Sequence, residues 1–140
     1  MSGSNERILL VDDDLDFLEM AGRILADEGY EVAKARGPEE ALSLIAAERP
    51  ALVVTDLMMS ALDAGFSLAR ALKGNPATSD LPVVVVSAIA GRLRLDFSPA
   101  GPADLEAMNA DAYFEKPLVP ARFLKKVREL LDRADREAAP

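Results

Sequence analysis

Residues 52–56 read Leu-Val-Val-Thr-Asp, a run of apolar and β-branched residues that ends on a carboxylate. A short apolar run of this kind is typical of a strand that is buried on both faces of a parallel sheet. In open α/β sheets, functional sites form outside the carboxyl ends of such strands. Asp56 is therefore a candidate centre for a site, provided that other strand ends meet it there.

Three more segments share this form, with apolar residues that lead directly to polar side chains: 8–11, 83–86 and 112–114. The polar residues that follow them are Asp12, Asp13 and Asp14, then Ser87, and then Glu115 with Lys116. A further segment, 30–35, alternates loosely between apolar and polar residues, which is typical of an edge strand. Together with residues 52–56, these segments predict five strands.

Segments with a helical spacing of apolar residues lie between the predicted strands. The clearest spans about residues 14–28, where apolar residues recur on one helical face. Others begin near Pro38, Gly65 and Pro120, and we expect the last to fray after Arg133. The alternation of strand and helix predicts an α/β fold with a doubly wound parallel sheet. Right-handed crossovers would then place the carboxyl end of every strand on the same side of the sheet.

The length of 140 residues fits one domain, which we place at residues 6–133, with flexible termini at 1–5 and 134–140. No apolar run approaches the roughly 18 residues that a membrane-spanning helix requires. The first residues also lack the basic and then apolar pattern of a signal peptide. We therefore expect a cytoplasmic protein with no membrane partner.

The chain contains no cysteine and no histidine. This composition excludes disulfides, thiolate metal sites, Ser-His-Asp triads and zinc sites with histidine ligands. The net charge of −8 has the wrong sign for a nucleic-acid-binding surface, so we expect no direct nucleic-acid partner. Any chemistry must therefore depend on carboxylates, hydroxyls and amines.

The predicted topology brings Asp12, Asp13 and Asp56 to one sheet edge, where their charges would repel. A hard divalent cation removes this repulsion, and Mg²⁺ favours oxygen ligands and often takes one or two carboxylates. The acids at 12–14 have a second interpretation, because acids at the start of a helix cap its backbone and complement its dipole. The sequence favours Asp14 as that cap and leaves both interpretations open for its neighbours.

A carboxylate at such a site can act as a nucleophile and accept a phosphoryl group. This transfer requires a metal ion to neutralise the phosphoryl oxygens, and cationic or hydrogen-bonding groups to hold them. Lys116 would supply the charge and Ser87 the hydroxyl. Each residue alone also fits an ordinary surface lysine or a strand-end serine, so the prediction depends on the four strand ends taken together.

Four stretches resemble the signature of response-regulator receiver domains: Val11–Asp14, Thr55–Met59, Val86–Ala88 and Tyr113–Pro117. Their order and approximate spacing are similar to those of the family over about residues 6–133. The resemblance implies a flavodoxin-like fold whose five parallel strands lie in the order 2-1-3-4-5. It also implies two-component signalling, in which the domain takes a phosphoryl group from a histidine kinase or a phosphotransfer protein and switches a protein-binding surface.

The resemblance further implies roles for the residues around the phosphoryl group. Asp56 would be the phosphorylation site, and Lys116 and Ser87 would contact the phosphoryl oxygens. Tyr113, at the position of the family's switch aromatic, would turn inward when Ser87 moves. Such a domain would catalyse only its own phosphorylation and dephosphorylation.

A Mg²⁺ site is implied in the same way. Asp13, Asp56 and the backbone carbonyl of Met58 would bind the cation directly, and Asp12 would assist through a water molecule.

Met58 and Ile89 are apolar at positions where family members control the access of attacking water. We therefore expect slow dephosphorylation.

The sequence departs from the family pattern in two regions. Ser60 stands where the family usually has proline, in a loop that is one residue longer than usual. Ser87 and Lys116 lie 29 positions apart, more than is usual, and the additional residues fall in the Gly- and Pro-rich segment 89–102. We expect the fourth helix of the family to be shortened or replaced there by a long loop, which would fold over the site or form an unusual output surface.

Two other functions remain compatible with the sequence. A haloacid-dehalogenase-like phosphatase would use Asp12 as its nucleophile, and a pseudo-receiver would keep the fold but signal without phosphate. No output domain follows Pro140, so we expect either a stand-alone receiver or a fragment of a longer chain. The output partner is not identified by the sequence, and a homodimer is possible.

Overall fold

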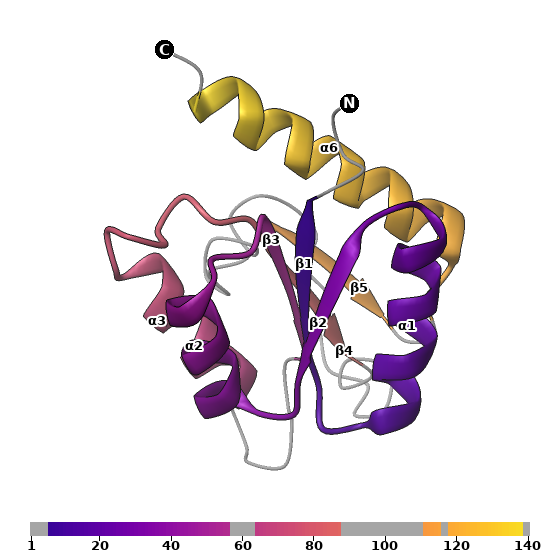
Figure 1. Cartoon of the computed structure of the whole chain (residues 1–140), viewed down its shortest axis with the longest axis horizontal. Coiled ribbons are helices and arrows are strands. Elements are labelled where there is room, and N and C mark those ends of the chain that lie inside the picture. Colours follow the sequence, from indigo (N-terminus) through magenta and orange to yellow (C-terminus); the bar gives the residue numbers. More distant parts are fainter. Residues whose placement is uncertain (1–5, 57–63, 88–110, 116–117, 139–140) are drawn as a thin grey trace.

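The computed structural model describes residues 6–56, 64–87, 111–115 and 118–138, which form a parallel sheet between two layers of helices (Figure 1). The strands are β1 (Arg7–Val11), β2 (Glu31–Ala35), β3 (Leu52–Asp56), β4 (Val83–Ser87) and β5 (Ala112–Glu115). Their order is β2-β1-β3-β4-β5, and every neighbouring pair is parallel. The predicted fold class and strand order are therefore confirmed.

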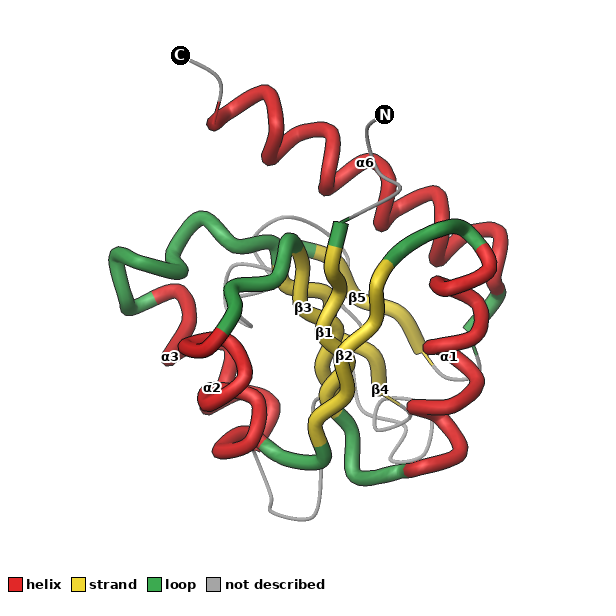
Figure 2. Tube along the Cα trace, viewed as in Figure 1, coloured by secondary structure: helices red, strands yellow, loops and turns green. Residues whose placement is uncertain are grey.

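Helices cover both faces of the sheet, as the tube in Figure 2 shows. The described helices are α1 (Leu15–Asp27), α2 (Pro38–Ala47), α3 (Ala64–Lys73) and α6 (Pro120–Ala138). α1 and α6 pack on one face, where Phe17 and Phe123 belong to the same buried cluster. α2 and α3 cover the other face through a second cluster that contains Ile45 and Leu72. The sheet is thus enclosed by apolar side chains on both sides.

The inner strands are buried on both faces, which explains why their sequences are continuous apolar runs. In β1, Leu10 packs toward α1 and α6, whereas Leu9 packs toward α2 and α3. β2 differs because it lies at the edge, and its Glu31 and Lys34 are exposed. Charged side chains on an edge strand hinder pairing with another chain. The loose alternation at residues 30–35 therefore reflects the edge position that it predicted.

The ends of α1 and α6 illustrate how the sequence sets helix boundaries. α1 ends at Asp27, and Gly29 follows with a φ of 97°, a conformation that glycine adopts without steric cost. α6 begins at Pro120 as expected but continues to Ala138, past the fraying point predicted at Arg133. The residues after Arg133 include alanine, arginine and glutamate, which have high helix propensity, so the helix extends further than its apolar pattern.

A partly buried carboxylate, Asp111, joins three elements on the side of the sheet where the strands begin. We call this side the amino edge, and the side where the strands end the carboxyl edge. Its Oδ2 accepts hydrogen bonds from the Lys73 ammonium at 3.0 Å and from the Val83 backbone N–H at 2.8 Å. Its Oδ1 accepts one from the Arg133 guanidinium at 3.1 Å. The Asp111 side chain is 21% exposed and Lys73 is 23% exposed, so water screens this pair only in part. Asp111 therefore fixes α3 and α6 to the start of β4.

Two features that were predicted from the sequence fall outside the described residues. They are the unusual loop that begins at Ser60 and the long loop expected over residues 89–102. In the described part of the chain, no helix is both long enough and apolar enough to cross a membrane.

Candidate functional site

Asp56 is the last residue of β3, which lies between β1 and β4 at the middle of the sheet. Asp56 is 7% exposed, and the preceding Thr55 is fully buried. The Thr55 hydroxyl donates a hydrogen bond to the Asp56 backbone carbonyl at 3.1 Å. The strand therefore places a nearly buried carboxylate at the carboxyl edge of the sheet, as residues 52–56 predicted.

Asp12 follows β1 directly and is fully buried. Its backbone N–H donates to the Ala35 carbonyl at 3.0 Å, which extends the pairing of β1 with β2 by one residue. Its carboxylate Oδ1 accepts a hydrogen bond from the Asp14 backbone N–H at 2.9 Å. The first contact fixes the backbone of Asp12 and the second fixes its carboxylate.

Asp14 is the N-cap of α1, as the sequence favoured. Its Oδ1 accepts hydrogen bonds from the backbone N–H groups of Asp16 at 3.0 Å and Phe17 at 3.3 Å. These contacts satisfy two donors that a helix start leaves without partners. Capping therefore explains Asp14 but does not explain why Asp12 and Asp13 are also acidic.

The carboxylates of Asp12, Asp13 and Asp56 form a cluster in which one oxygen from each lies within 4.8 Å of the others. Asp12 and Asp56 are buried, whereas Asp13 is exposed. Charges this close in a partly buried setting repel strongly unless a cation compensates them. Three oxygen donors with one open side are the chemistry that a hard divalent cation such as Mg²⁺ prefers. The residues at this position therefore fit a Mg²⁺ site.

The other predicted site residues are described only in part. Ser87 is the last residue of β4 and pairs with Glu115 of β5, but its side chain is outside the described set. Tyr113 lies on β5 opposite Val85 and packs, partly buried, against the apolar cluster beneath α2 and α3. Lys116 and Met58 lie outside the described residues. The topology thus carries β4 and β5 toward the same edge as the carboxylates.

Two exposed apolar residues near this edge were not singled out from the sequence. Leu15, the first residue of α1, is 57% exposed, and Val119, just before α6, is 51% exposed. Leu15 lies outside the inward face of α1 that begins with Phe17, a signal that the sequence contained. Both belong to segments that follow the carboxyl ends of strands, Leu15 after β1 and Val119 after β5.

A family model described as response regulator receiver domain matches residues 8–128. Response regulator MprA of Mycobacterium tuberculosis is 39% identical over 133 residues, which cover 95% of this chain and 54% of that protein. The chain therefore spans about half the length of this curated relative.

Two solved structures show the same fold over nearly the whole chain. A response regulator receiver domain protein from Methanospirillum hungatei has a TM-score of 0.77 at 28% identity, covering 95% of this chain and 98% of that one. The signal receiver domain of a signal transduction histidine kinase from Syntrophus aciditrophicus has a TM-score of 0.74 at 28% identity. This second match covers 91% of this chain and 90% of that one.

Proposed function

Since the chain belongs to the response regulator receiver domains of two-component signalling, we propose that Asp56 accepts a phosphoryl group from a histidine kinase or a phosphotransfer protein. The observation that carries this proposal is the cluster of Asp12, Asp13 and Asp56, with oxygens within 4.8 Å of one another. Of the three, Asp56 lies at the end of the central strand and is nearly buried but retains 7% exposure. Asp12 is fully buried and is therefore less accessible to a donor.

The proposed transfer forms a bond between an Asp56 carboxylate oxygen and phosphorus, and breaks the bond from phosphorus to the donor nitrogen. The electron pair of the broken bond returns to the donor imidazole, which leaves as the unphosphorylated histidine. Lys116 would hold the phosphoryl oxygens through its positive charge, and Ser87 would donate its hydroxyl to them.

Mg²⁺ is the cofactor that these residues fit. Asp13, Asp56 and the Met58 backbone carbonyl would hold the cation, with Asp12 acting through a water molecule. When bound, it would neutralise part of the negative charge on the phosphoryl oxygens. The exposed position of Asp13 leaves the outer side of the cluster open to solvent and donor.

The proposed output is a change in the surface around β4 and β5. Movement of Ser87 toward the phosphoryl group would open space for the Tyr113 ring to turn inward. Tyr113 lies two residues before Glu115, the partner of Ser87 in the sheet register, so the two strands that carry the switch are adjacent. Either a second copy of the chain or another protein would read this surface.

Acetyl phosphate with Mg²⁺, followed by mass-spectrometric mapping of the modified residue, tests this function. We expect one phosphoryl group on Asp56 and none in Asp56→Asn. Asp14→Asn is the matched control, because Asp14 is a neighbouring acid that caps α1 and lies outside the cluster. It should therefore keep phosphorylation.

Other results of this experiment would contradict the proposal. Phosphate on Asp12 would favour the phosphatase with Asp12 as nucleophile. If the protein is not phosphorylated and also does not bind beryllofluoride in the presence of Mg²⁺, a pseudo-receiver that signals without phosphate is favoured.

A further inference from the structure

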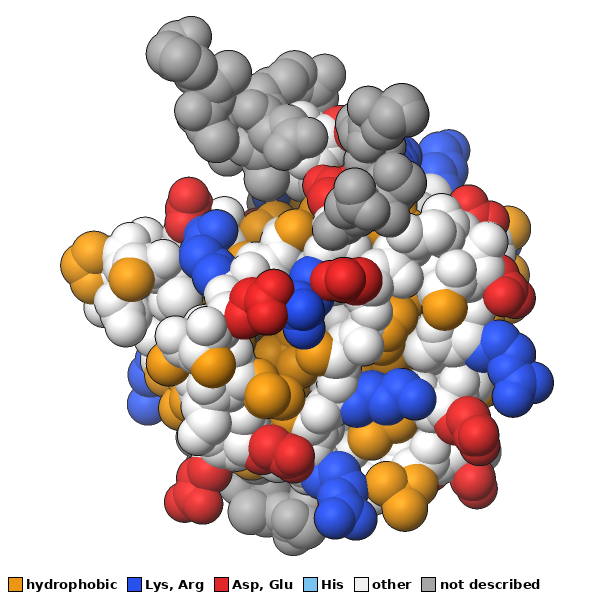
Figure 3. Space-filling model, viewed as in Figure 1, with side chains coloured by type: hydrophobic (Ala, Val, Ile, Leu, Met, Phe, Trp, Pro, Cys, Tyr) orange, Lys and Arg blue, Asp and Glu red, His pale blue; other side chains and the backbone are white. Residues whose placement is uncertain are grey.

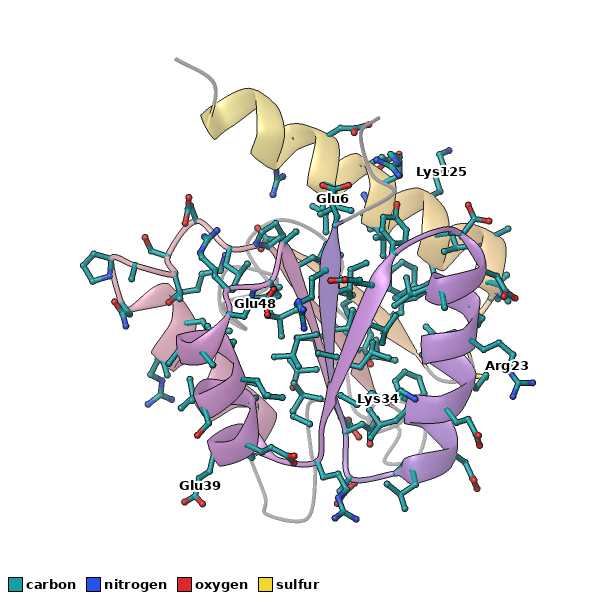
Figure 4. All side chains as sticks on the ribbon, viewed as in Figure 1. Glu6, Arg23, Lys34, Glu39, Glu48 and Lys125 are labelled. Carbon is teal, nitrogen blue, oxygen red and sulfur yellow. The ribbon has the colours of Figure 1, made fainter. Side chains whose placement is uncertain are left out.

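Four polar side chains are buried in the part of the chain that the structure describes: Asp12, Thr55, Asp56 and Thr78. Acidic and basic side chains are spread over the surface seen in Figure 3. In Figure 4, the labelled side chains of Arg23 and Lys125 point away from the sheet. Of the four buried groups, Asp12 and Asp56 belong to the carboxylate cluster. Thr55 lies directly beside that cluster in β3, and its buried hydroxyl calls for a physical reason.

A hydroxyl is an unusual group for this position. Val54 precedes Thr55, and the sheet register places Thr55 opposite Val11 of β1 and Val85 of β4. Valine has nearly the same shape as threonine and would fit among these neighbours without a polar atom. Burying a hydroxyl costs free energy unless it makes a hydrogen bond. Thr55 makes that bond to the Asp56 backbone carbonyl, at 3.1 Å.

The Asp56 carbonyl lies where the pairing of β3 with β1 stops. Backbone N–H and C=O groups of successive strand residues point alternately to the two neighbouring strands. Val53 points to β4, because its N–H donates to the Pro82 carbonyl at 3.0 Å, so Asp56 points to the side of β1. The β1 register ends with Val11 opposite Thr55, and the chain then turns into α1. The Thr55 hydroxyl therefore binds this carbonyl at the point where β1 no longer runs beside it.

This hydrogen bond fixes the peptide plane that follows Asp56. The register with β1 holds Thr55, the residue before, and the register with β4 holds Asp56 opposite Val86. The backbone of Asp56 is thus held on both sides, and its φ and ψ determine which side-chain rotamers are allowed. The direction of the Asp56 carboxylate consequently depends on Thr55, although the two side chains face opposite sides of the strand.

We propose that Thr55 is a positioning residue for the Asp56 carboxylate, acting through its hydrogen bond to the Asp56 carbonyl. The inference rests on the proposed function, because it concerns the same phosphorylation. Thr55 is fully buried and does not reach a phosphoryl donor, so its effect passes through the backbone of Asp56 alone. A misplacement of about 1 Å in a reacting group can slow a reaction roughly 100-fold, so a small change in this backbone is measurable.

The rate constant for phosphorylation of Asp56 by acetyl phosphate, measured on the full chain at saturating Mg²⁺, tests the proposal. Thr55→Val and Thr55→Ala remove the hydroxyl and should lower this rate constant about three- to tenfold. Thr55→Ser loses the same methyl group as Thr55→Ala but keeps the hydroxyl, and should stay within about twofold of the wild type. The comparison of serine with alanine separates the hydrogen bond from the volume of the side chain.

Thr78→Val is the matched control. Thr78 is a second buried threonine, in the connection between α3 and β4, and its hydroxyl donates to the Leu72 carbonyl at 2.7 Å. Its loss should lower the midpoint of urea unfolding and leave the rate constant of the folded protein within about twofold of the wild type. Thr55→Val should do the reverse, keeping the unfolding midpoint while phosphorylation slows.

The possible outcomes distinguish this inference from the function on which it rests. A wild type that is phosphorylated on Asp56, with Thr55→Val and Thr55→Ala equally fast, would overturn the inference and leave the function intact. An equal fall in Thr55→Ser and Thr55→Ala would attribute the effect to side-chain volume and would also overturn it. A wild type that takes no phosphate on Asp56 would overturn both.

Discussion

Carboxylates are grouped together at the carboxyl edge of the sheet, whereas at the amino edge they are paired with cations. At the carboxyl edge, Asp12, Asp13 and Asp56 gather with oxygens within 4.8 Å of one another. At the amino edge, acids lie against cations instead, as Asp111 does with Lys73 and Arg133. The same side-chain chemistry therefore concentrates negative charge at one edge and balances it at the other.

This difference separates function from stability within one sheet. Grouped carboxylates cost folding free energy and become useful only when a cation or phosphoryl chemistry compensates them. Paired carboxylates contribute to folding because their donors would otherwise be buried without a partner. Substitutions that neutralise an acid should therefore have opposite effects on stability at the two edges.

The largest expected effect is at Asp111. Asp111→Ala should lower the free energy of unfolding by about 2–3 kcal/mol, because it leaves the partly buried Val83 N–H without its acceptor and the Lys73 ammonium with only the Leu81 carbonyl. Urea unfolding measures this loss. Asp80→Ala is the matched control, since Asp80 pairs with Arg49 at 2.7 Å but is 74% exposed. Its loss should stay below about 1 kcal/mol. Similar losses in both variants would show that the Asp111 network adds nothing.

A smaller effect of opposite sign is expected at Asp13. Without divalent cations, Asp13→Asn should raise the free energy of unfolding by about 1 kcal/mol, because it removes repulsion within a cluster that solvent screens on one side. Added Mg²⁺ should then stabilise the variant less than the wild type. Urea unfolding with EDTA and with Mg²⁺ checks both statements.

Asp16→Asn is the control for that measurement. Asp16 is also an exposed acid, but it lies in the first turn of α1, where negative charge is favourable. Its neutralisation should cost about 0.5 kcal/mol rather than stabilise. A loss of stability in Asp13→Asn as well would contradict the role of repulsion at the carboxyl edge.

The smallest effect concerns Tyr30, near the amino edge. Burial raises the pKa of the Tyr30 hydroxyl above its usual value of 10.0, although the Arg128 guanidinium, 5.4 Å from the ring centre, opposes the shift. The folded protein then holds this proton to higher pH than the unfolded chain. The contribution of the Tyr30 hydroxyl to the free energy of unfolding is therefore fully present below about pH 10 and is lost as the pH rises further.

Tyr30→Phe removes this titration and keeps the ring. The unfolding temperature of the variant should fall less between pH 9 and 11 than that of the wild type, as thermal unfolding at both pH values would show. Equal falls in the two proteins would mean that Tyr30 does not contribute to the alkaline loss.

Much of the carboxyl edge could be predicted because its residues follow strands directly. Asp56 ends an apolar run, and Asp12 and Asp13 follow another, so parallel topology alone predicts that they meet. Asp14 could be assigned as a cap because an acid preceded an amphipathic helix. The sequence did not indicate how far α6 continues, since propensity extends that helix beyond its apolar face.

The contacts at the amino edge could not be predicted from residues that are adjacent in the chain. Asp111 lies 38, 28 and 22 positions from Lys73, Val83 and Arg133, and no local pattern links residues at such separations. Val119 looks like an ordinary residue at the start of a helix until the packing shows that it is 51% exposed.

The sequence by itself determined the order of strands and helices, the cap of α1 and the end of the sheet at which the acids gather. These features depend on periodicity and on residues next to each other in the chain, which are local properties. The tertiary structure alone decided which acids are compensated and by which cations. Those outcomes depend on distances between residues far apart in the chain, and only packing fixes them.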